Sequence, residues 1–200
     1  MIRKNLHNLL QSPRLYTNLR GLLTFGVRKA PLRNALKLEK GEKILDLACG
    51  TGDYSPIISS PDNSYLGLDI NDKYIHSAIK KHSAPNREFN VQDILELEFK
   101  ENEFDKSLYI GIMHHLNDED NLTILKTLKQ ITNKNVFVLD WSPGGINIFT
   151  NLFSKLDRGK YIRNLNEQVE LISRVMKVVD SRNYYVRSGI LRYSLISCKP

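Results

Sequence analysis

Short apolar segments alternate with amphipathic ones along most of the chain. Runs rich in β-branched and aliphatic residues predict strands, which we expect at residues 43–48, 64–70, 87–93, 104–112, 135–141, 181–188 and 191–198. Apolar residues at helical spacing predict helices near residues 53–59 and at 73–83, 118–133 and 166–179. Strands separated by helices pair in parallel, whereas the last two strands, joined near Gly189, must be antiparallel. The pattern predicts an α/β fold with a doubly wound, mostly parallel sheet.

Residues 1–40 have a different pattern, in which apolar residues at helical spacing alternate with basic ones. Ser12 and Pro13 are typical of a helix start, and Gly21 and Gly26 interrupt or end helices. We expect two or three short helices here, forming an N-terminal lid on a domain of residues 41–200. At 200 residues the whole chain is expected to be a single domain.

The net charge of +7 is concentrated in this N-terminal segment. Residues 1–40 hold nine Lys and Arg residues against one acid, Glu39, while the remainder is nearly neutral. Such a segment suits contact with phosphate, on nucleic acid or an anionic membrane, or with an acidic substrate. A surface that only aids solubility is the alternative.

The composition of the chain indicates its cellular compartment. The hydrophobic content is 41% and the mean hydropathy is −0.35, with no run near the ~18 apolar residues that a membrane span needs. No secretory signal follows the basic start, and Cys49 and Cys198 make no disulfide framework. We expect a cytoplasmic protein, with peripheral contact to the inner membrane face as an option for the basic segment.

The segment "ILDLACGTGDYS", residues 44–55, joins the first strand to a turn with two glycines. It lacks the Lys-Ser/Thr that ends a phosphate-binding P-loop. A dinucleotide fingerprint needs a third Gly or Ala where Ser55 stands, and Asp53 would oppose a pyrophosphate at the helix start. An acidic loop suits a ligand that carries positive charge, such as S-adenosylmethionine with its sulfonium and ammonium groups.

The string from Leu45 to Asp53 resembles motif I of the class I S-adenosylmethionine-dependent methyltransferases. Further positions match the family in order: Asp69 after the second strand, Asp93 after the third and Ile110-Gly111 on the fourth. The resemblance implies a Rossmann-like seven-stranded sheet, an antiparallel closing strand and helices on both faces. It also implies a cofactor site made of Asp46, Ala48, Cys49, Gly50, Thr51, Gly52, Asp69, Ile70, Asp93, Ile94, Ile110 and Tyr16, and no metal.

The acceptor side is read from the residues after the fourth and fifth strands. The Asn/Asp-Pro-Pro-aromatic motif of amino-methyltransferases is absent, and His114-His115 stands there, a pattern common in small-molecule and lipid methyltransferases. Either histidine could act as a base near neutral pH, or only pack against the cofactor. Asp140 and Trp141 end the fifth strand on the same edge.

The stretch "LYTNLRGLLTFGVRK" is similar to the first segment of quinone C-methyltransferases, with Tyr16 nine residues before Phe25. Arg20-Gly21 and His114-His115 depart from that group, which puts a quinone acceptor in doubt. Residues 142–164, with glycines, apolar residues and the basic residues Arg158, Lys160 and Arg163, suit a mobile acceptor-side segment or an ordinary helix.

The leading hypothesis is therefore methyl transfer from S-adenosylmethionine to a small-molecule or lipid-like acceptor. An RNA methyltransferase is the first alternative, favoured by the pI of about 9.3, and would bind RNA in a salt-sensitive way. A non-catalytic partner protein that keeps the cofactor pocket is the second. The sequence does not indicate the oligomeric state.

Overall fold

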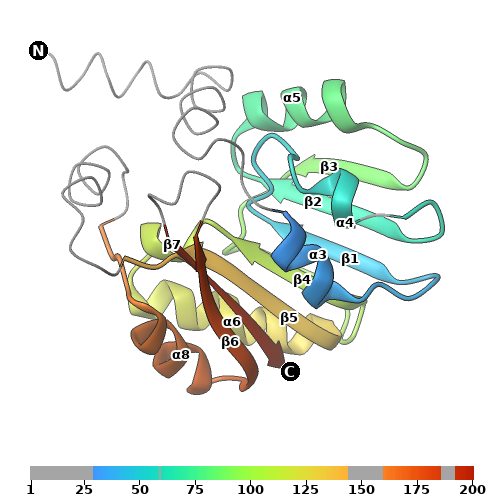
Figure 1. The fold of residues 1–200 in the computed structure, drawn as a ribbon. Coiled ribbons are helices and arrows are strands. Elements are labelled where there is room, and N and C mark those ends of the chain that lie inside the picture. Colours follow the sequence, from blue (N-terminus) through green and yellow to red (C-terminus); the bar gives the residue numbers. More distant parts are fainter. Residues whose placement is uncertain (1–28, 59, 144–159, 186–191) are drawn as a thin grey trace, which may run out of the picture.

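The computed structural model describes residues 29–58, 60–143, 160–185 and 192–200 (Figure 1). Its centre is a seven-stranded sheet in the order β3-β2-β1-β4-β5-β7-β6. The strands are β1 (Lys43–Leu47), β2 (Ser64–Asp69), β3 (Arg87–Val91), β4 (Phe104–Ile110), β5 (Thr132–Trp141), β6 (Lys177–Tyr185) and β7 (Arg192–Lys199). β1 to β5 pair in parallel, and β7 runs antiparallel to both of its neighbours. The predicted mostly parallel sheet with an antiparallel closing strand is confirmed.

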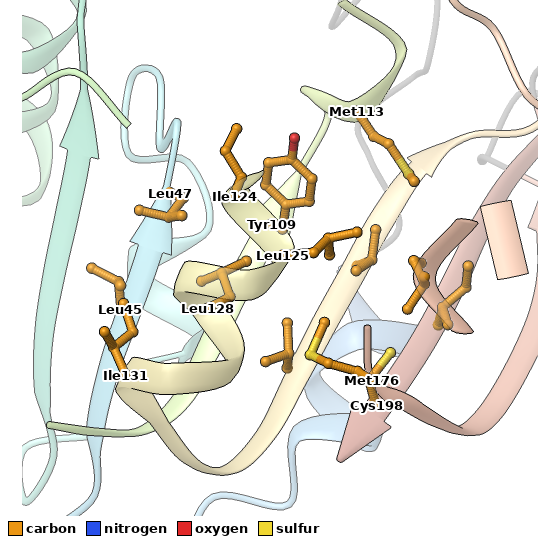
Figure 2. Packing of buried hydrophobic residues seen from close by; sticks show 14 of the residues in the cluster. Leu45, Leu47, Tyr109, Met113, Ile124, Leu125, Leu128, Ile131, Met176 and Cys198 are labelled. Carbon is orange, nitrogen blue, oxygen red and sulfur yellow. The ribbon is translucent and has the colours of Figure 1, made fainter. Parts of the chain in front are cut away.

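Helices cover both faces of the sheet, as predicted (Figure 1). They are α3 (Ala30–Leu36), α4 (Ser55–Ile58), α5 (Asp72–His82), the 3-10 turn η1 (Met113–His115), α6 (Asp118–Ile131) and α8 (Leu165–Ser173). Successive side chains of β1 point to opposite faces. Leu45 and Leu47 pack against α6 in a cluster shown in Figure 2, whereas Ile44 joins the cluster under α3 and α5.

Two predicted helix ends were wrong. The helix expected at 118–133 ends at Ile131, because Thr132 already pairs with Phe104 of β4, so that β5 starts three residues earlier than expected. The helix expected at 166–179 ends at Ser173, and Lys177 and Val178 belong to β6. In both cases pairing with a neighbouring strand outweighs a periodic pattern that would continue the helix.

The predicted N-terminal lid falls largely outside the described residues, which begin at Lys29. Within them, α3 buries Leu32 and Leu36 completely against the sheet. The division at residue 40 and the lid itself stay predictions. None of the helices that the structure describes combines the length and apolar composition needed to cross a membrane.

A buried ion pair lies at the end of the sheet where the parallel strands begin. Lys106 of β4 is 4% exposed, and its Nζ donates to both carboxylate oxygens of Glu42 at 2.7 and 2.6 Å. Lys134 also contacts Glu42, at 2.9 Å. Burial raises the pKa of Glu42, but the hydrogen bonds from Lys106 and Lys134 outweigh it, and the net direction is down.

Glu42→Gln is expected to lower the free energy of unfolding by about 3–5 kcal/mol, because it leaves the buried Lys106 ammonium without its counter-charge. Glu39→Gln is the matched control, since that carboxylate is 71% exposed and should change stability by less than about 1 kcal/mol. Since the pKa of Glu42 is lowered, the wild-type advantage should be complete above its usual pKa and fade as the pH falls below it. Urea denaturation of the three proteins at neutral and acidic pH measures both effects.

Candidate functional site

The turn after β1 has an unusual backbone conformation, with three residues in the left-handed region. Ala48, Gly50 and Gly52 have φ of +57°, +58° and +72°. The amide of Gly52 donates to the carbonyl of Cys49 at 3.0 Å, which closes the turn. A Cβ at Gly50 would meet no atom of the described residues within 4 Å, whereas one at Gly52 would lie 2.9 Å from the Phe89 ring. Gly50 therefore faces open space and Gly52 faces the protein.

Asp69 at the end of β2 is joined to this turn. Its Oδ2 accepts from the amide of Gly50 at 2.9 Å, and its Oδ1 accepts from the amide of Asn71 at 2.9 Å. Burial raises the pKa of Asp69, and the two backbone hydrogen bonds act against this. Each carboxylate oxygen has further lone pairs, so Asp69 can accept hydrogen bonds from a ligand while it keeps both backbone bonds.

Asp46, on β1, is 1% exposed and lies on the same face as the aromatic residues of β2 and β3. Its Oδ2 accepts from the hydroxyl of Tyr65 at 2.8 Å, while its Oδ1 has no hydrogen-bond partner among the described residues. Cys49 and Thr51 are also buried, and burial raises the pKa of the Cys49 thiol, so that this group stays protonated and unreactive.

The remaining predicted cofactor residues lie at the ends of neighbouring strands. Asp93 follows β3, and its Oδ1 accepts from the amide of Leu95 at 2.9 Å. Ile70 follows β2 and is 67% exposed, while Ile94 and Ile110 are partly buried. The structure thus brings the predicted residues of the chain from Asp46 onward to the carboxyl edge of β3, β2, β1 and β4, where ligands bind in open α/β sheets. Tyr16 lies outside the described residues.

His114 and Asp140 form a buried pair at the ends of β4 and β5. The Nδ1 of His114 lies 2.5 Å from Oδ1 of Asp140, and the amide of His114 donates to Oδ2 at 2.8 Å. Both residues are buried, and the amide of Trp141 also donates to Oδ1 at 2.7 Å. A carboxylate held in this way fixes the histidine with a proton on Nδ1.

The sequence singled out His114 and Asp140 separately and did not indicate their pairing. His115 packs beside His114, with ring centroids 4.1 Å apart. The turn that carries both histidines is held by Asn121 of α6, whose side-chain amide donates to the carbonyls of Met113, Leu116 and Asn117. Asn121 was missed, although a polar residue at a buried helical position was its signal.

Within the described ranges, no group of three His, Cys, Asp or Glu side chains is arranged to hold a metal ion. The described residues place three features at this edge: the turn at Gly50, the carboxylates of Asp46 and Asp69, and the His114–Asp140 pair.

Comparisons with known proteins agree with this geometry. The sequence model of a family described as "Methyltransferase domain" matches residues 44–135. A demethylmenaquinone methyltransferase of Staphylococcus aureus is 26% identical over 163 residues, which cover 76% of this chain. The chain spans 66% of the length of that relative.

Solved structures share the fold. A methyltransferase from Aquifex aeolicus superposes with a TM-score of 0.72 at 16% identity, covering 94% of this chain and 98% of that one. A magnesium protoporphyrin IX methyltransferase from Synechocystis, solved with bound S-adenosylhomocysteine, gives a TM-score of 0.66 at 16% identity and covers 86% and 80%. The solved structures show the fold alone, whereas the family match over residues 44–135 and the Staphylococcus aureus relative support a class I S-adenosylmethionine-dependent methyltransferase, with S-adenosylmethionine as the cofactor.

Proposed function

We propose that the chain transfers a methyl group from S-adenosylmethionine to a small, hydrophobic, lipid-like acceptor that loses a proton in the reaction. The observation that carries this proposal is the buried His114–Asp140 pair at the ends of β4 and β5, on the same sheet edge as the glycine turn after β1. A base is needed only where the acceptor must be deprotonated, so a preorganised histidine favours such an acceptor.

Three observations support a fit between the residues present and the cofactor. The open side of Gly50 leaves room for a ligand against the backbone. Asp69 has lone pairs free for two ribose hydroxyls. Asp46 holds a buried oxygen without a donor in the described part of the chain. In the proposed site, Ile70, Asp93 and Ile94 surround the adenine, as the family resemblance implies, and Ala48, Cys49, Thr51, Gly52 and Ile110 line the cofactor with their backbone.

When bound, S-adenosylmethionine supplies a methyl group on a positively charged sulfur, which leaves as a neutral thioether. The protein's task is alignment and the exclusion of water. Asp140 keeps the proton of His114 on Nδ1, so that Nε2 is the basic nitrogen and receives the proton of the acceptor. Asn121 and the backbone contacts of the turn hold that imidazole in place.

The acceptor class is argued from the relative and from the histidine pair. The Staphylococcus aureus relative is named for demethylmenaquinone, an aromatic quinone with a lipid tail. A reduced ring of this type has acidic hydroxyls, which suits deprotonation by a neutral imidazole. We extend this to phenol-like or hydroquinone-like acceptors in general. Peripheral contact between the basic N-terminal segment and an anionic membrane would bring the enzyme to such an acceptor.

Asp69→Asn is expected to weaken binding of S-adenosylmethionine about 10- to 100-fold, because hydrogen bonds to a charged carboxylate are replaced by weaker ones. Isothermal titration calorimetry measures the dissociation constant. Asp62→Asn is the matched control, because this carboxylate is exposed and precedes β2 at the opposite end of the strand. Equal affinity of Asp69→Asn and wild type would remove Asp69 from the cofactor site.

Transfer of a radiolabelled methyl group then tests the reaction. We expect label on a reduced, short-chain naphthoquinone presented in anionic vesicles, and none on transfer RNA. Salt-sensitive labelling of RNA would replace the acceptor with nucleic acid. Cofactor binding without transfer to either acceptor would favour a non-catalytic partner protein.

A further inference from the structure

Tyr65, a buried tyrosine of β2 that the sequence did not single out, reaches the site through its hydroxyl. The hydroxyl donates to Oδ2 of Asp46 at 2.8 Å, and the ring packs edge-on against Phe89 with centroids 5.5 Å apart. Asp46 lies opposite Gly67 in the pairing of β1 with β2. A Cβ at Gly67 would come within 3.0 Å of the Tyr65 hydroxyl. The missing side chain at Gly67 therefore gives the hydroxyl its room beside Asp46.

The other oxygen of Asp46 is the unexplained feature. Oδ1 is buried and has no hydrogen-bond partner in the described ranges, although Asp46 is 1% exposed. A buried carboxylate oxygen without a donor is costly, so the arrangement is complete only when a donor arrives. Asp46 stands two residues before Ala48, where the chain enters the glycine turn. The missing donor is therefore expected from a ligand of that turn.

The charges around Asp46 favour a cationic donor. The pKa of Asp46 is raised to about 7, mainly by burial and also by the negative charge of Asp69, while the hydrogen bond from Tyr65 acts in the opposite direction. Tyr65 and Cys49 contribute no charge, because burial raises the pKa of both groups. The positive charge of Arg87, on β3, acts against this rise in the pKa of Tyr65. A positive group at Oδ1 would offset both the burial and the repulsion from Asp69.

We infer that Tyr65 is a positioning residue for the cofactor: it holds Oδ2 of Asp46 and leaves Oδ1 for the ammonium group of S-adenosylmethionine, whose binding displaces a proton from Asp46. The inference rests on the proposed cofactor site. It adds a residue outside motif I and a linkage between cofactor affinity and pH.

The linkage has a definite sign. The ammonium group binds the ionised carboxylate, so affinity rises with pH until Asp46 is ionised in the free protein. With a pKa of about 7, binding should release about 0.9 proton at pH 6 and about 0.5 at pH 7, and affinity should rise about fivefold between them. The window ends near pH 7.5, because the ordinary pKa of an α-amino group is about 7.7–8.0.

Tyr65→Phe removes the hydrogen bond that stabilises the ionised form. At pH 7 it should weaken binding of S-adenosylmethionine about 5- to 50-fold, and the dependence on pH should stay steep up to pH 7.5. Tyr184→Phe is the matched control. Tyr184 lies on β6, at the far edge of the sheet, and its hydroxyl has no hydrogen-bond partner among the described residues. It should bind as wild type does.

Calorimetry with two ligands separates this inference from the proposed function. 5′-Methylthioadenosine lacks the amino-acid portion, so its affinity should be independent of pH and unchanged in Tyr65→Phe. Titrations of the wild-type protein in buffers of different ionisation enthalpy count the released protons, which keeps the test valid if Tyr65→Phe fails to fold.

Binding of S-adenosylmethionine without proton release at pH 6, or an equal loss for both ligands in Tyr65→Phe, would overturn the inference and leave the cofactor site standing. No binding of either ligand to the wild-type protein would overturn the cofactor site itself.

Discussion

Gly50→Ala is expected to weaken binding of S-adenosylmethionine by about a hundredfold or more while the protein stays folded. The amide of Gly50 is held by Asp69, so the turn cannot easily move aside. A Cβ there would meet no atom within 4 Å in the part of the chain that the structure describes, and would project into the space that the proposed cofactor occupies. Contact with the ligand, and not a clash within the protein, is therefore the cause of the loss.

The backbone conformation adds a cost that has to be separated from this effect. Gly50 has φ of +58°, and placing a side chain on a left-handed residue costs about 1–2 kcal/mol of stability. Gly41→Ala is the matched control, because Gly41 has φ of +81°, also faces open space, and precedes β1 at the opposite end of that strand. It should lose similar stability and bind the cofactor normally.

Calorimetry and thermal unfolding of both variants decide the outcome. Normal binding by Gly50→Ala would mean that the cofactor does not lie against this backbone. Gly52→Ala cannot serve in the same test, because its Cβ would lie 2.9 Å from Phe89 and 3.1 Å from Ala78. That variant would disturb the packing of the turn on α5 and β3 as well as any ligand.

The fold follows largely from local patterns that the sequence carries in full. β1 and β4 are short and mostly apolar, and the two longer helices between parallel strands have their own caps, Asn71 before α5 and Asn117 before α6. The errors lie where two patterns compete. Thr132 continues the helical period, yet in the fold its hydroxyl is 2.6 Å from that of Ser107 on β4. Such a contact depends on strand pairing and is invisible in the sequence.

The site divides in the same way. The glycine turn and the acids that follow each strand are local features, and the sequence predicted that they share one sheet edge. The pairings Asp46–Tyr65 and His114–Asp140 join residues 19 and 26 positions apart and depend on strand register. Tyr65 in particular reads as an ordinary buried strand residue. Its hydroxyl becomes part of the site only through the register of β1 against β2. This register places Asp46 opposite Gly67, whose missing side chain leaves room for the hydroxyl.

Asp140→Asn is expected to lower kcat about 10²- to 10⁴-fold and to leave the affinity for S-adenosylmethionine unchanged. In the wild type, Oδ2 of Asp140 accepts from the amide of His114, and Oδ1 accepts from Nδ1 of His114 and from the amide of Trp141. Asparagine has one acceptor and one donor. If its oxygen keeps the amide of His114, its amino group faces Nδ1 and forces the imidazole proton onto Nε2. The nitrogen that should receive the proton of the acceptor then already carries one.

A purely structural role for Asp140 predicts a different result, because a disturbed turn would slow every acceptor equally. If His114 is the base, acceptors with a more acidic hydroxyl need it less and should lose less activity in Asp140→Asn. Rates for a series of substituted phenols or hydroquinones, with saturating cofactor, measure this dependence. Asp180→Asn makes the same chemical change on the exposed strand β6 and should leave all rates unchanged. An equal loss of rate for all acceptors would mean that Asp140 only holds the turn in place. Another group or water would then remove the proton of the acceptor.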